Sequence, residues 1–280
     1  MTPQKIFGLI GYPVKHSLSP LMYSAAFSRL KIKANYKLFP LKERQLMDFL
    51  SGLKIKGICG LNVTIPYKEK VLEYIKLTSE GVRAIRAANT LVIDKAGKVR
   101  AHNTDCLGFA RHIKELKVKP KKVAIIGAGG ASKAVIFALI KLKAQAIFIY
   151  DIDKFRALAL VNRFNQLFSG CRVRAVACID ELALSDKDLL INASPVGMKD
   201  TDPLLIEPRN LHKDLFVYDL IYNPAETKLL KAAKVAGCRY SNGLGMLLYQ
   251  GVEALELWLK PKKAPVEVMR AALLKGVSKL

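Results

Sequence analysis

The chain has 280 residues, 51% of them hydrophobic and 25% charged, which excludes a disordered protein and indicates a folded globular one. A single core rarely extends beyond about 250–300 residues, so we expect two domains. The most apolar stretch, residues 134–140, is far shorter than the roughly 20 residues of a membrane span. The apolar segment near the N-terminus is interrupted by Gly8, Gly11 and Pro13, which favours a buried strand over a signal peptide. We therefore expect a cytoplasmic protein without a membrane partner.

The sequence carries 46 basic and 23 acidic residues, a formal net charge of +23. Such a field attracts small anions, nucleic acids and acidic membrane surfaces alike. The local basic runs, residues 117–122 and 260–263, are short and contain no aromatic side chains on which bases would stack. We therefore expect a lysine-rich solvated surface, a small-molecule substrate and no specific nucleic-acid partner.

The cysteines and histidines do not suggest a metal centre. The five cysteines are odd in number and form no C-x-x-C pair, which argues against a disulfide framework and a structural zinc site. The four histidines are scattered along the chain. We predict reduced thiols and no bound metal.

In the first half of the chain, short apolar segments alternate with segments of helical periodicity. We predict strands over residues 6–11, 36–41, 57–64 and 88–94, and helices over residues 20–30, 42–53 and 69–77. The last of these strands ends in a hairpin-like turn, KAGK. This alternation predicts an α/β domain.

A second alternation follows a helix predicted over residues 107–116. We predict strands over residues 122–126, 146–150, 172–176, 189–192 and 216–219, and helices over residues 132–142 and 154–168. Two more helices, over residues 247–259 and 266–277, end the chain. The sequence thus predicts two α/β domains, with no internal repeat.

A glycine turn, GAGGAS, lies directly between the strand over 122–126 and the following helix. In this context Gly127 permits a tight turn, and Gly129 lets the backbone approach a pyrophosphate at the helix N-terminus. Ser132 stands where the third glycine of the usual fingerprint would be, while Gly130 and Ala131 are small. We predict a dinucleotide-binding turn; a tight loop without a ligand is the alternative.

An acidic residue, Asp151, follows the next predicted strand, 24 positions after Gly127. A carboxylate here typically accepts hydrogen bonds from the ribose hydroxyls of NAD and repels the 2′-phosphate of NADP. Asp151 therefore favours NAD, although the nearby Lys154 and Arg156 leave NADP open. Capping of the following helix is a second role that Asp151 can have.

Polar side chains gather at strand ends in the first half of the chain. Ser17 and Ser19, spaced by one residue in a turn, suit a carboxylate; the alternative for Ser19 is a helix N-cap ahead of Pro20. Lys68 and Asp105 are a candidate acid–base pair. Further polar residues at these ends are Asn62, Thr64, Asn89, Thr90 and Asn103.

Taken together, these segments resemble one family. In chain order the matching motifs are GYPVKHSLSP, NVTIPYK, AANTLV, NTDCLGF, GAGGASKAV, INASPVGM, DLIYNP and GLGMLLYQG, a series similar to that of the shikimate dehydrogenases and extending from residue 8 to about residue 258. The resemblance implies a cytoplasmic enzyme of aromatic amino-acid (chorismate) biosynthesis that reversibly reduces 3-dehydroshikimate to shikimate, usually with NADPH.

The resemblance also implies a domain arrangement and a set of site residues. A mixed-sheet substrate domain would comprise residues 1–105 and 243–280, with the C-terminal helices packing back on it, and a Rossmann-like dinucleotide domain would comprise residues 106–242. The implied catalytic residues are Lys68 and its partner Asp105. The implied substrate contacts are Ser17 and Ser19 for the carboxylate, Thr64, Asn89, Asp105 and Gln250 for the ring hydroxyls, and Tyr222. The implied cofactor contacts are Gly127, Ala128, Gly129, Gly130 and Ala131 for the pyrophosphate, Asp151 for the ribose, and Tyr222, Gly243 and Met246 beside the nicotinamide.

Two points in this sequence bear on the subtype. NADP-dependent members typically carry Asn-Arg-Thr after the second strand of the nucleotide domain, where this chain has Asp151, Ile152 and Asp153. Both serines of the carboxylate motif are kept, whereas quinate-preferring bacterial members often carry Thr at the second. We therefore predict shikimate as substrate and favour NAD. One alternative is an NAD-dependent quinate or quinate/shikimate dehydrogenase. Another is a non-catalytic dinucleotide-binding or nucleic-acid-binding protein of the same fold, although the presence of both Lys68 and Asp105 argues against it. A homodimer is an assembly that the sequence leaves open.

Overall fold

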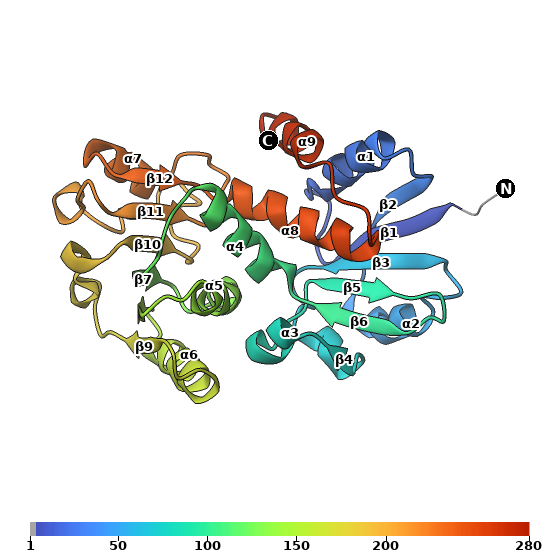
Figure 1. Ribbon diagram of the computed structural model, residues 1–280, viewed down its shortest axis with the longest axis horizontal. Helices are drawn as coiled ribbons and strands as arrows, with labels where there is room; N and C mark the ends of the chain where they lie inside the picture. Colours follow the sequence, from blue (N-terminus) through green and yellow to red (C-terminus); the bar gives the residue numbers. More distant parts are fainter. Residues whose placement is uncertain (1–3, 280) are drawn as a thin grey trace. The chain divides into compact units, whose positions relative to one another are not determined.

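The computed structural model describes residues 4–279 and divides the chain into two compact units. Unit 1 comprises Met1–Gly108 and Leu248–Leu280, and unit 2 comprises Phe109–Leu247. The chain passes from unit 1 into unit 2 within helix α4 (Thr104–Glu115) and returns within helix α8 (Leu244–Trp258) (Figure 1). Each unit contains one sheet, so the prediction of two α/β domains is confirmed.

Unit 1 is built on a mixed sheet. Its strands are β1 (Lys5–Gly11), β2 (Ala34–Pro40), β3 (Ile58–Val63), β4 (Leu77–Thr78), β5 (Thr90–Ile93) and β6 (Val99–His102). They lie in the order β2-β1-β3-β5-β6-β4. Strand β1 pairs in parallel with β2 and β3, β5 is antiparallel to β3 and β6, and β4 is parallel to β6. The polar segments that follow β3, precede β5 and follow β6 therefore meet at one end of this sheet.

The helices of unit 1 are α1 (Ser19–Arg29), α2 (Leu46–Ser51), α3 (Glu80–Ile85), α9 (Val266–Val277) and the part of α8 that begins at Leu248. Helix α1 buries Met22, Tyr23, Ala26 and Phe27, a spacing that places one apolar stripe toward the core. Helix α9 packs directly against α1 (Figure 1). The predicted return of the C-terminal helices to the first domain is therefore confirmed.

A cluster of aromatic rings joins α1, α8 and the sheet in unit 1. The Trp258 ring lies 5.0 Å from that of Phe7 and 5.2 Å from that of Tyr23. Its indole Nε1 donates a hydrogen bond to the carbonyl oxygen of Leu91 at 2.9 Å. The indole covers Gly60 of β3 so closely that a Cβ there would lie 2.4 Å from Trp258 Nε1. A glycine at this point of the strand is what allows α8 to lie on the sheet.

Unit 2 is built on an all-parallel sheet. Its strands are β7 (Lys122–Ile126), β8 (Ala146–Tyr150), β9 (Arg172–Ala175), β10 (Leu189–Asn192), β11 (Phe216–Asp219) and β12 (Arg239–Ser241). They lie in the order β12-β11-β10-β7-β8-β9, which, numbered within the sheet, is the 3-2-1-4-5-6 order of the Rossmann fold. The order reverses between β7 and β10, and ligands of such sheets bind outside the carboxyl ends of the strands at this reversal.

The helices of unit 2 are α5 (Gly130–Lys141), α6 (Lys154–Leu167), α7 (Lys228–Val235) and the first turn of α8, up to Leu247, together with the part of α4 that follows Gly108. Strands β10 and β11 are buried along their whole length, as expected for a parallel sheet covered on both faces. Thr227 caps α7 and also donates a hydrogen bond to the buried Asp219 at the end of β11, at 2.7 Å.

Several predicted elements need correction. The segment 42–53, predicted as one helix, is a 3-10 turn over Glu43–Gln45 followed by α2. The helix predicted over 69–77 is wrong, because this segment contains only a 3-10 turn over Lys70–Glu73. Leu77 and Thr78 instead pair with Arg100 and Ala101 as an edge strand, so sheet pairing overrides the local helical pattern. Strands β6 and β12 and helices α3 and α7 were not predicted, all of them short segments.

Across residues 4–279, the structure contains no helix that combines the length and the apolar character needed to cross a bilayer.

Replacement of Gly60 by Ala is expected to lower the free energy of unfolding by about 1–3 kcal/mol, because the new Cβ would overlap the Trp258 indole. The fluorescence of Trp258, the single tryptophan of the sequence, reports denaturant unfolding. Gly170→Ala is the matched control, since a Cβ at Gly170 meets nothing within 4 Å. A Gly60→Ala protein as stable as the wild type would contradict this packing.

Candidate active site

Lys68 and Asp105 form an ion pair in unit 1. Lys68 Nζ lies 2.6 Å from Asp105 Oδ2, and the two side chains are 33% and 17% exposed. Lys68 follows β3, and its carbonyl oxygen accepts a hydrogen bond from the backbone N–H of Ala88 at 2.7 Å, which ties this loop to the segment ahead of β5. Asp105 occupies the first turn of α4, where the helix dipole favours a carboxylate. The predicted pair is thus formed, with an ammonium group accessible to a reactant.

The second oxygen of Asp105 is held by the buried Asn89. Asn89 Nδ2 donates a hydrogen bond to Asp105 Oδ1 at 2.8 Å. Asn89 Oδ1 in turn accepts from the backbone N–H of Thr104 at 2.6 Å and from its hydroxyl at 3.1 Å. Because both carboxylate oxygens have a partner, the orientation of Asp105, and with it the position of Lys68 Nζ, is fixed.

The two serines lie in the turn that leads into α1. The backbone N–H of Ser19 donates a hydrogen bond to Ser17 Oγ at 3.2 Å, and that of Ser17 to the carbonyl oxygen of Val14 at 3.1 Å. The N-cap residue of α1 is Leu18, and no side chain caps this helix, so the alternative role of Ser19 as N-cap is wrong. Ser17 Oγ accepts from the backbone, which leaves its proton available to a carboxylate.

Thr64 and Gln250 belong to the same unit as the ion pair. Thr64 directly follows β3, and its backbone N–H donates to the carbonyl oxygen of Ile10 at 2.9 Å. Gln250 lies on α8 opposite Gly108 of α4, where a Cβ would lie 2.4 Å from the Gln250 backbone nitrogen. Gly108 therefore permits the close approach of the two helices that brings Gln250 into place, a role that was not predicted.

The glycine turn of unit 2 has the geometry of an anion-binding turn. Gly127 has φ +103°, a conformation that favours glycine, and a Cβ there would lie 2.8 Å from the Ala193 carbonyl carbon. By contrast, a Cβ at Gly129 or Gly130 would meet nothing within 4 Å. Ser132, in the position of the third glycine, is buried and donates a hydrogen bond to the Gly127 carbonyl oxygen at 2.6 Å. The turn precedes α5 at the reversal of the strand order, and the N-terminus of a helix at such a point attracts a phosphate.

Asp151 is bound to this turn. Asp151 Oδ2 accepts a hydrogen bond from the Ala128 backbone N–H at 2.6 Å, and Oδ1 accepts from that of Asp153 at 2.8 Å. The N-cap of α6 is Asp153, which accepts from Phe155 and Arg156, so the alternative role of Asp151 as helix cap is wrong. Arg156 also forms an ion pair with Asp153 at 3.2 Å.

Tyr222, Gly243 and Met246 lie in unit 2, after β11 and around the start of α8. The backbone N–H of Gly243 donates to the carbonyl oxygen of Ile221 at 3.1 Å, and a Cβ at Gly243 would lie 2.0 Å from the Leu220 carbonyl oxygen. Burial raises the pKa of the Tyr222 phenol, which therefore stays neutral at physiological pH. The backbone of Met246 hydrogen-bonds the buried Tyr218 phenol and lowers its pKa, against the larger raising effect of burial.

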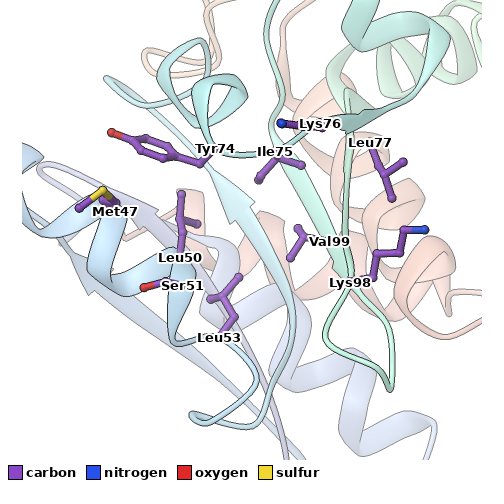
Figure 2. Close-up of a pocket in the computed structure, with 10 residues that line it drawn as sticks. All are labelled: Met47, Leu50, Ser51, Leu53, Tyr74, Ile75, Lys76, Leu77, Lys98 and Val99. Atoms are coloured by element: carbon purple, nitrogen blue, oxygen red, sulfur yellow. The ribbon is translucent and has the colours of Figure 1, made fainter.

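A cavity of about 470 Å³ opens elsewhere in unit 1, beside α2, β4 and β6. Figure 2 shows Leu50 and Leu53 facing Ile75, Leu77 and Val99 across it. None of the predicted site residues lines this cavity, so it is separate from the Lys68–Asp105 site. Within residues 4–279, no three His, Cys, Asp or Glu side chains come together in a way that would hold a metal ion.

Comparison with known proteins identifies the family. Residues 9–91 match the model of the shikimate dehydrogenase substrate binding domain, and residues 243–274 match that of the shikimate 5'-dehydrogenase C-terminal domain. The shikimate dehydrogenase (NADP(+)) of Methanopyrus kandleri is 42% identical over 96% of this chain and 94% of its own.

Two solved structures show the likeness in three dimensions. Shikimate 5-dehydrogenase from Listeria monocytogenes, in complex with shikimate and NAD, is 32% identical, with a TM-score of 0.91 over 98% of this chain and 97% of its own. Quinate dehydrogenase from Corynebacterium glutamicum, in complex with NAD, is 33% identical, with a TM-score of 0.90 over 97% of this chain and 99% of its own. From the motif series, the two sheets and these similarities together, the chain belongs to the shikimate dehydrogenase family.

Proposed function

We propose that the protein catalyses the reversible reduction of 3-dehydroshikimate to shikimate with a nicotinamide dinucleotide. The observation that carries this proposal is the Lys68–Asp105 pair at 2.6 Å, with Asp105 held at 2.8 Å by Asn89. A bound dinucleotide supplies or accepts the hydride. Lys68 Nζ donates a proton to the ring carbonyl oxygen as negative charge develops there, and in the reverse direction it removes the hydroxyl proton.

Unit 1 has the side chains that this substrate requires. Ser17 and Ser19 bind the carboxylate, and Thr64, Asn89 and Gln250 bind the ring hydroxyls; these residues all belong to the unit that contains Lys68. Asp105 accepts from the ammonium group and keeps it directed at the reacting oxygen. In a dehydrogenase the cofactor carries out the redox chemistry, and the usual contribution of the protein is orientation of this kind.

Unit 2 binds the dinucleotide in this proposal. The open space around Gly129 and Gly130 accommodates the pyrophosphate, and Tyr222, Gly243 and Met246 contact the nicotinamide portion. A Cβ at Gly129 or Gly130 would occupy this space without disturbing the protein itself, which is the behaviour of glycines required by a ligand rather than by the fold.

We propose NAD rather than NADP as the preferred dinucleotide. Asp151 is held at the turn by two backbone N–H groups, and its remaining lone pairs can accept from ribose hydroxyls while its charge repels a 2′-phosphate. Of the two cations that could bind that phosphate, Lys154 and Arg156, the second is paired with Asp153. The Listeria and Corynebacterium proteins were both solved with NAD, whereas the Methanopyrus relative is named for NADP(+).

Initial rates with shikimate and quinate, each with NAD and NADP, test the substrate and the cofactor together. We expect the highest kcat/KM for shikimate with NAD, because both serines of the carboxylate motif are present and Asp151 opposes a 2′-phosphate. Turnover of quinate equal to or better than that of shikimate would instead support a quinate dehydrogenase. Preference for NADP would refute the role given to Asp151.

Lys68→Ala is expected to lower kcat by about 10²–10⁴-fold while dinucleotide binding persists, since it removes the proton donor. Lys70→Ala is the matched control: its side chain is 32% exposed, close to the 33% of Lys68, but it pairs with Glu43. Equilibrium binding of the dinucleotide is measured beside turnover. A Lys68→Ala enzyme with wild-type kcat would disprove the catalytic assignment.

Asp151→Asn is expected to lower the ratio of kcat/KM for NAD to that for NADP by about tenfold, which corresponds to about 1.4 kcal/mol. The control is Asp188→Asn. Asp188 also accepts two backbone N–H groups, from Lys121 at 3.1 Å and Lys122 at 2.7 Å, but at the opposite end of β7. An unchanged ratio in Asp151→Asn, or an equal change in both variants, would show that Asp151 does not select the cofactor.

A further inference from the structure

A buried carboxyl group that takes no part in the proposed reaction lies at the end of β11 in unit 2. Asp219 is fully buried. Its Oδ1 accepts hydrogen bonds from Asn192 Nδ2 and from the backbone N–H of Ile221, both at 3.0 Å. Its Oδ2 accepts from the Thr227 hydroxyl at 2.7 Å. Asp219 is thus the common acceptor of three separate segments, which follow β10, follow β11 and begin α7.

The burial of Asp219 is not explained by stability. Burial raises the pKa of its carboxyl group, and three hydrogen bonds, rather than a nearby cation, oppose this rise. A buried carboxyl group of this kind costs free energy relative to an apolar side chain of similar shape. Stability alone therefore favours an apolar residue here, whereas only an acceptor imposes a fixed geometry on these three donors.

The bond to Ile221 fixes the segment that follows β11. Because Asp219 accepts from the residue two positions further on, its carboxylate folds this segment back on the end of the strand. The carbonyl oxygen of Ile221 accepts from the backbone N–H of Gly243 at 3.1 Å, just before α8. A Cβ at Gly243 would lie 2.0 Å from the Leu220 carbonyl oxygen, so the two backbones are in direct contact. Asp219 thereby sets the positions of Gly243 and of Tyr222, the residue after Ile221.

The bond to Asn192 fixes the segment that follows β10. Asn192 Oδ1 accepts from the backbone N–H of Ser194 at 3.0 Å and from its hydroxyl at 2.7 Å. A Cβ at Gly127 would lie 2.8 Å from the Ala193 carbonyl carbon and from the Ser194 nitrogen, so the glycine turn packs on this same segment. Through Asn192, Asp219 therefore also connects the segment after β11 with the glycine turn.

We propose that Asp219 is a positioning residue for the nicotinamide half of the dinucleotide, acting through Ile221. This inference rests on the proposed function, in which Tyr222 and Gly243 contact the nicotinamide. The carboxylate holds both contacts in place relative to the glycine turn before the cofactor binds. A misplacement of about 1 Å in a reacting group can lower a rate about 100-fold. Loss of the acceptor therefore slows hydride transfer more than it weakens binding of the phosphates and the adenine.

Asp219→Leu, which has a similar shape but no acceptor, is expected to lower kcat about tenfold or more. The KM for shikimate and the Kd for ADP-ribose are expected to change less than about twofold. ADP-ribose has both phosphates and the adenine but no nicotinamide; 2′-phospho-ADP-ribose is the probe if NADP proves the preferred cofactor. Titration with this probe counts the folded sites, and kcat is expressed per site, so partial unfolding does not count as loss of positioning.

Asp219→Asn is the conservative variant. Its one oxygen can still accept from Ile221 and Asn192, and its amide can donate to the hydroxyl oxygen of Thr227. We therefore expect a kcat per site within about threefold of the wild-type value. A loss in Asp219→Asn as large as that in Asp219→Leu would show that the acceptor geometry is not what matters.

Lys187→Met is the matched control. Lys187 is a charged residue that is only 3% exposed, and its Nζ donates to the Ala183 carbonyl oxygen at 3.1 Å. It lies just before β10, so it is in the same unit as Asp219 but at the opposite end of the parallel sheet. We expect Lys187→Met to keep the wild-type kcat per site. An equal loss in Lys187→Met, an unchanged kcat in Asp219→Leu, or a tenfold loss of ADP-ribose affinity in Asp219→Leu would overturn the proposal.

Two measurements on the wild type keep the test decisive. If Asp219→Leu does not fold, amide hydrogen exchange of the free wild-type protein replaces it: the Ile221 N–H should exchange slowly before any dinucleotide is bound, and fast exchange refutes the positioning role. Wild-type turnover of shikimate is measured first. A wild type without turnover contradicts the proposed function, whereas an active wild type with an unaffected Asp219→Leu variant contradicts only the role of Asp219.

Discussion

The carboxylate of Asp105 is the constraint on which the candidate catalytic site depends. It joins three segments far apart in the sequence: the loop after β3 through Lys68, the segment before β5 through Asn89, and the first turn of α4, to which it belongs. An ion pair as exposed as this one contributes little to stability, because solvent screens it and the lysine loses rotamer freedom. The ion pair matters instead for orientation, since an ammonium group held by a fixed carboxylate can be directed at one reacting oxygen.

In unit 2, the carboxylate of Asp151 joins separate segments as that of Asp105 does in unit 1. Asp151 accepts hydrogen bonds from two backbone N–H groups, one of them in the glycine turn itself, so the residue that we propose selects NAD also holds the turn that we propose binds the pyrophosphate. Unit 1 thus uses side-chain partners on a mixed sheet, whereas unit 2 uses backbone groups at the reversal of a parallel sheet. The difference suits the proposed ligands, because ring hydroxyls need side chains of particular reach and a pyrophosphate needs only N–H groups.

Local patterns were sufficient to predict the central strands of both sheets. The Lys68–Asp105 pair joins residues 37 positions apart and was expected from the family resemblance, not from a local pattern. Other contacts that depend on distant pairing were not predicted. The helix predicted over 69–77 failed because Leu77 and Thr78 complete an edge of the sheet, which no local pattern records. Helix α7 had a recognisable signal, Thr227 ahead of an amphipathic segment, that was overlooked. The phenol of Tyr36 reaches Asn62 from 26 residues away, and only the folded sheet brings the two together.

Ser132 shows how a departure from a sequence fingerprint can preserve its physical requirement. The third glycine of the usual pattern allows the helix to pack closely on the strand. A serine there would add a polar group to a buried interface, which costs free energy unless the hydroxyl is paired. Here the hydroxyl donates to the carbonyl oxygen of Gly127, inside the same turn. The position therefore requires a small side chain that leaves no polar atom unpaired, and serine meets that requirement while adding a bond that holds Gly127 in its left-handed conformation.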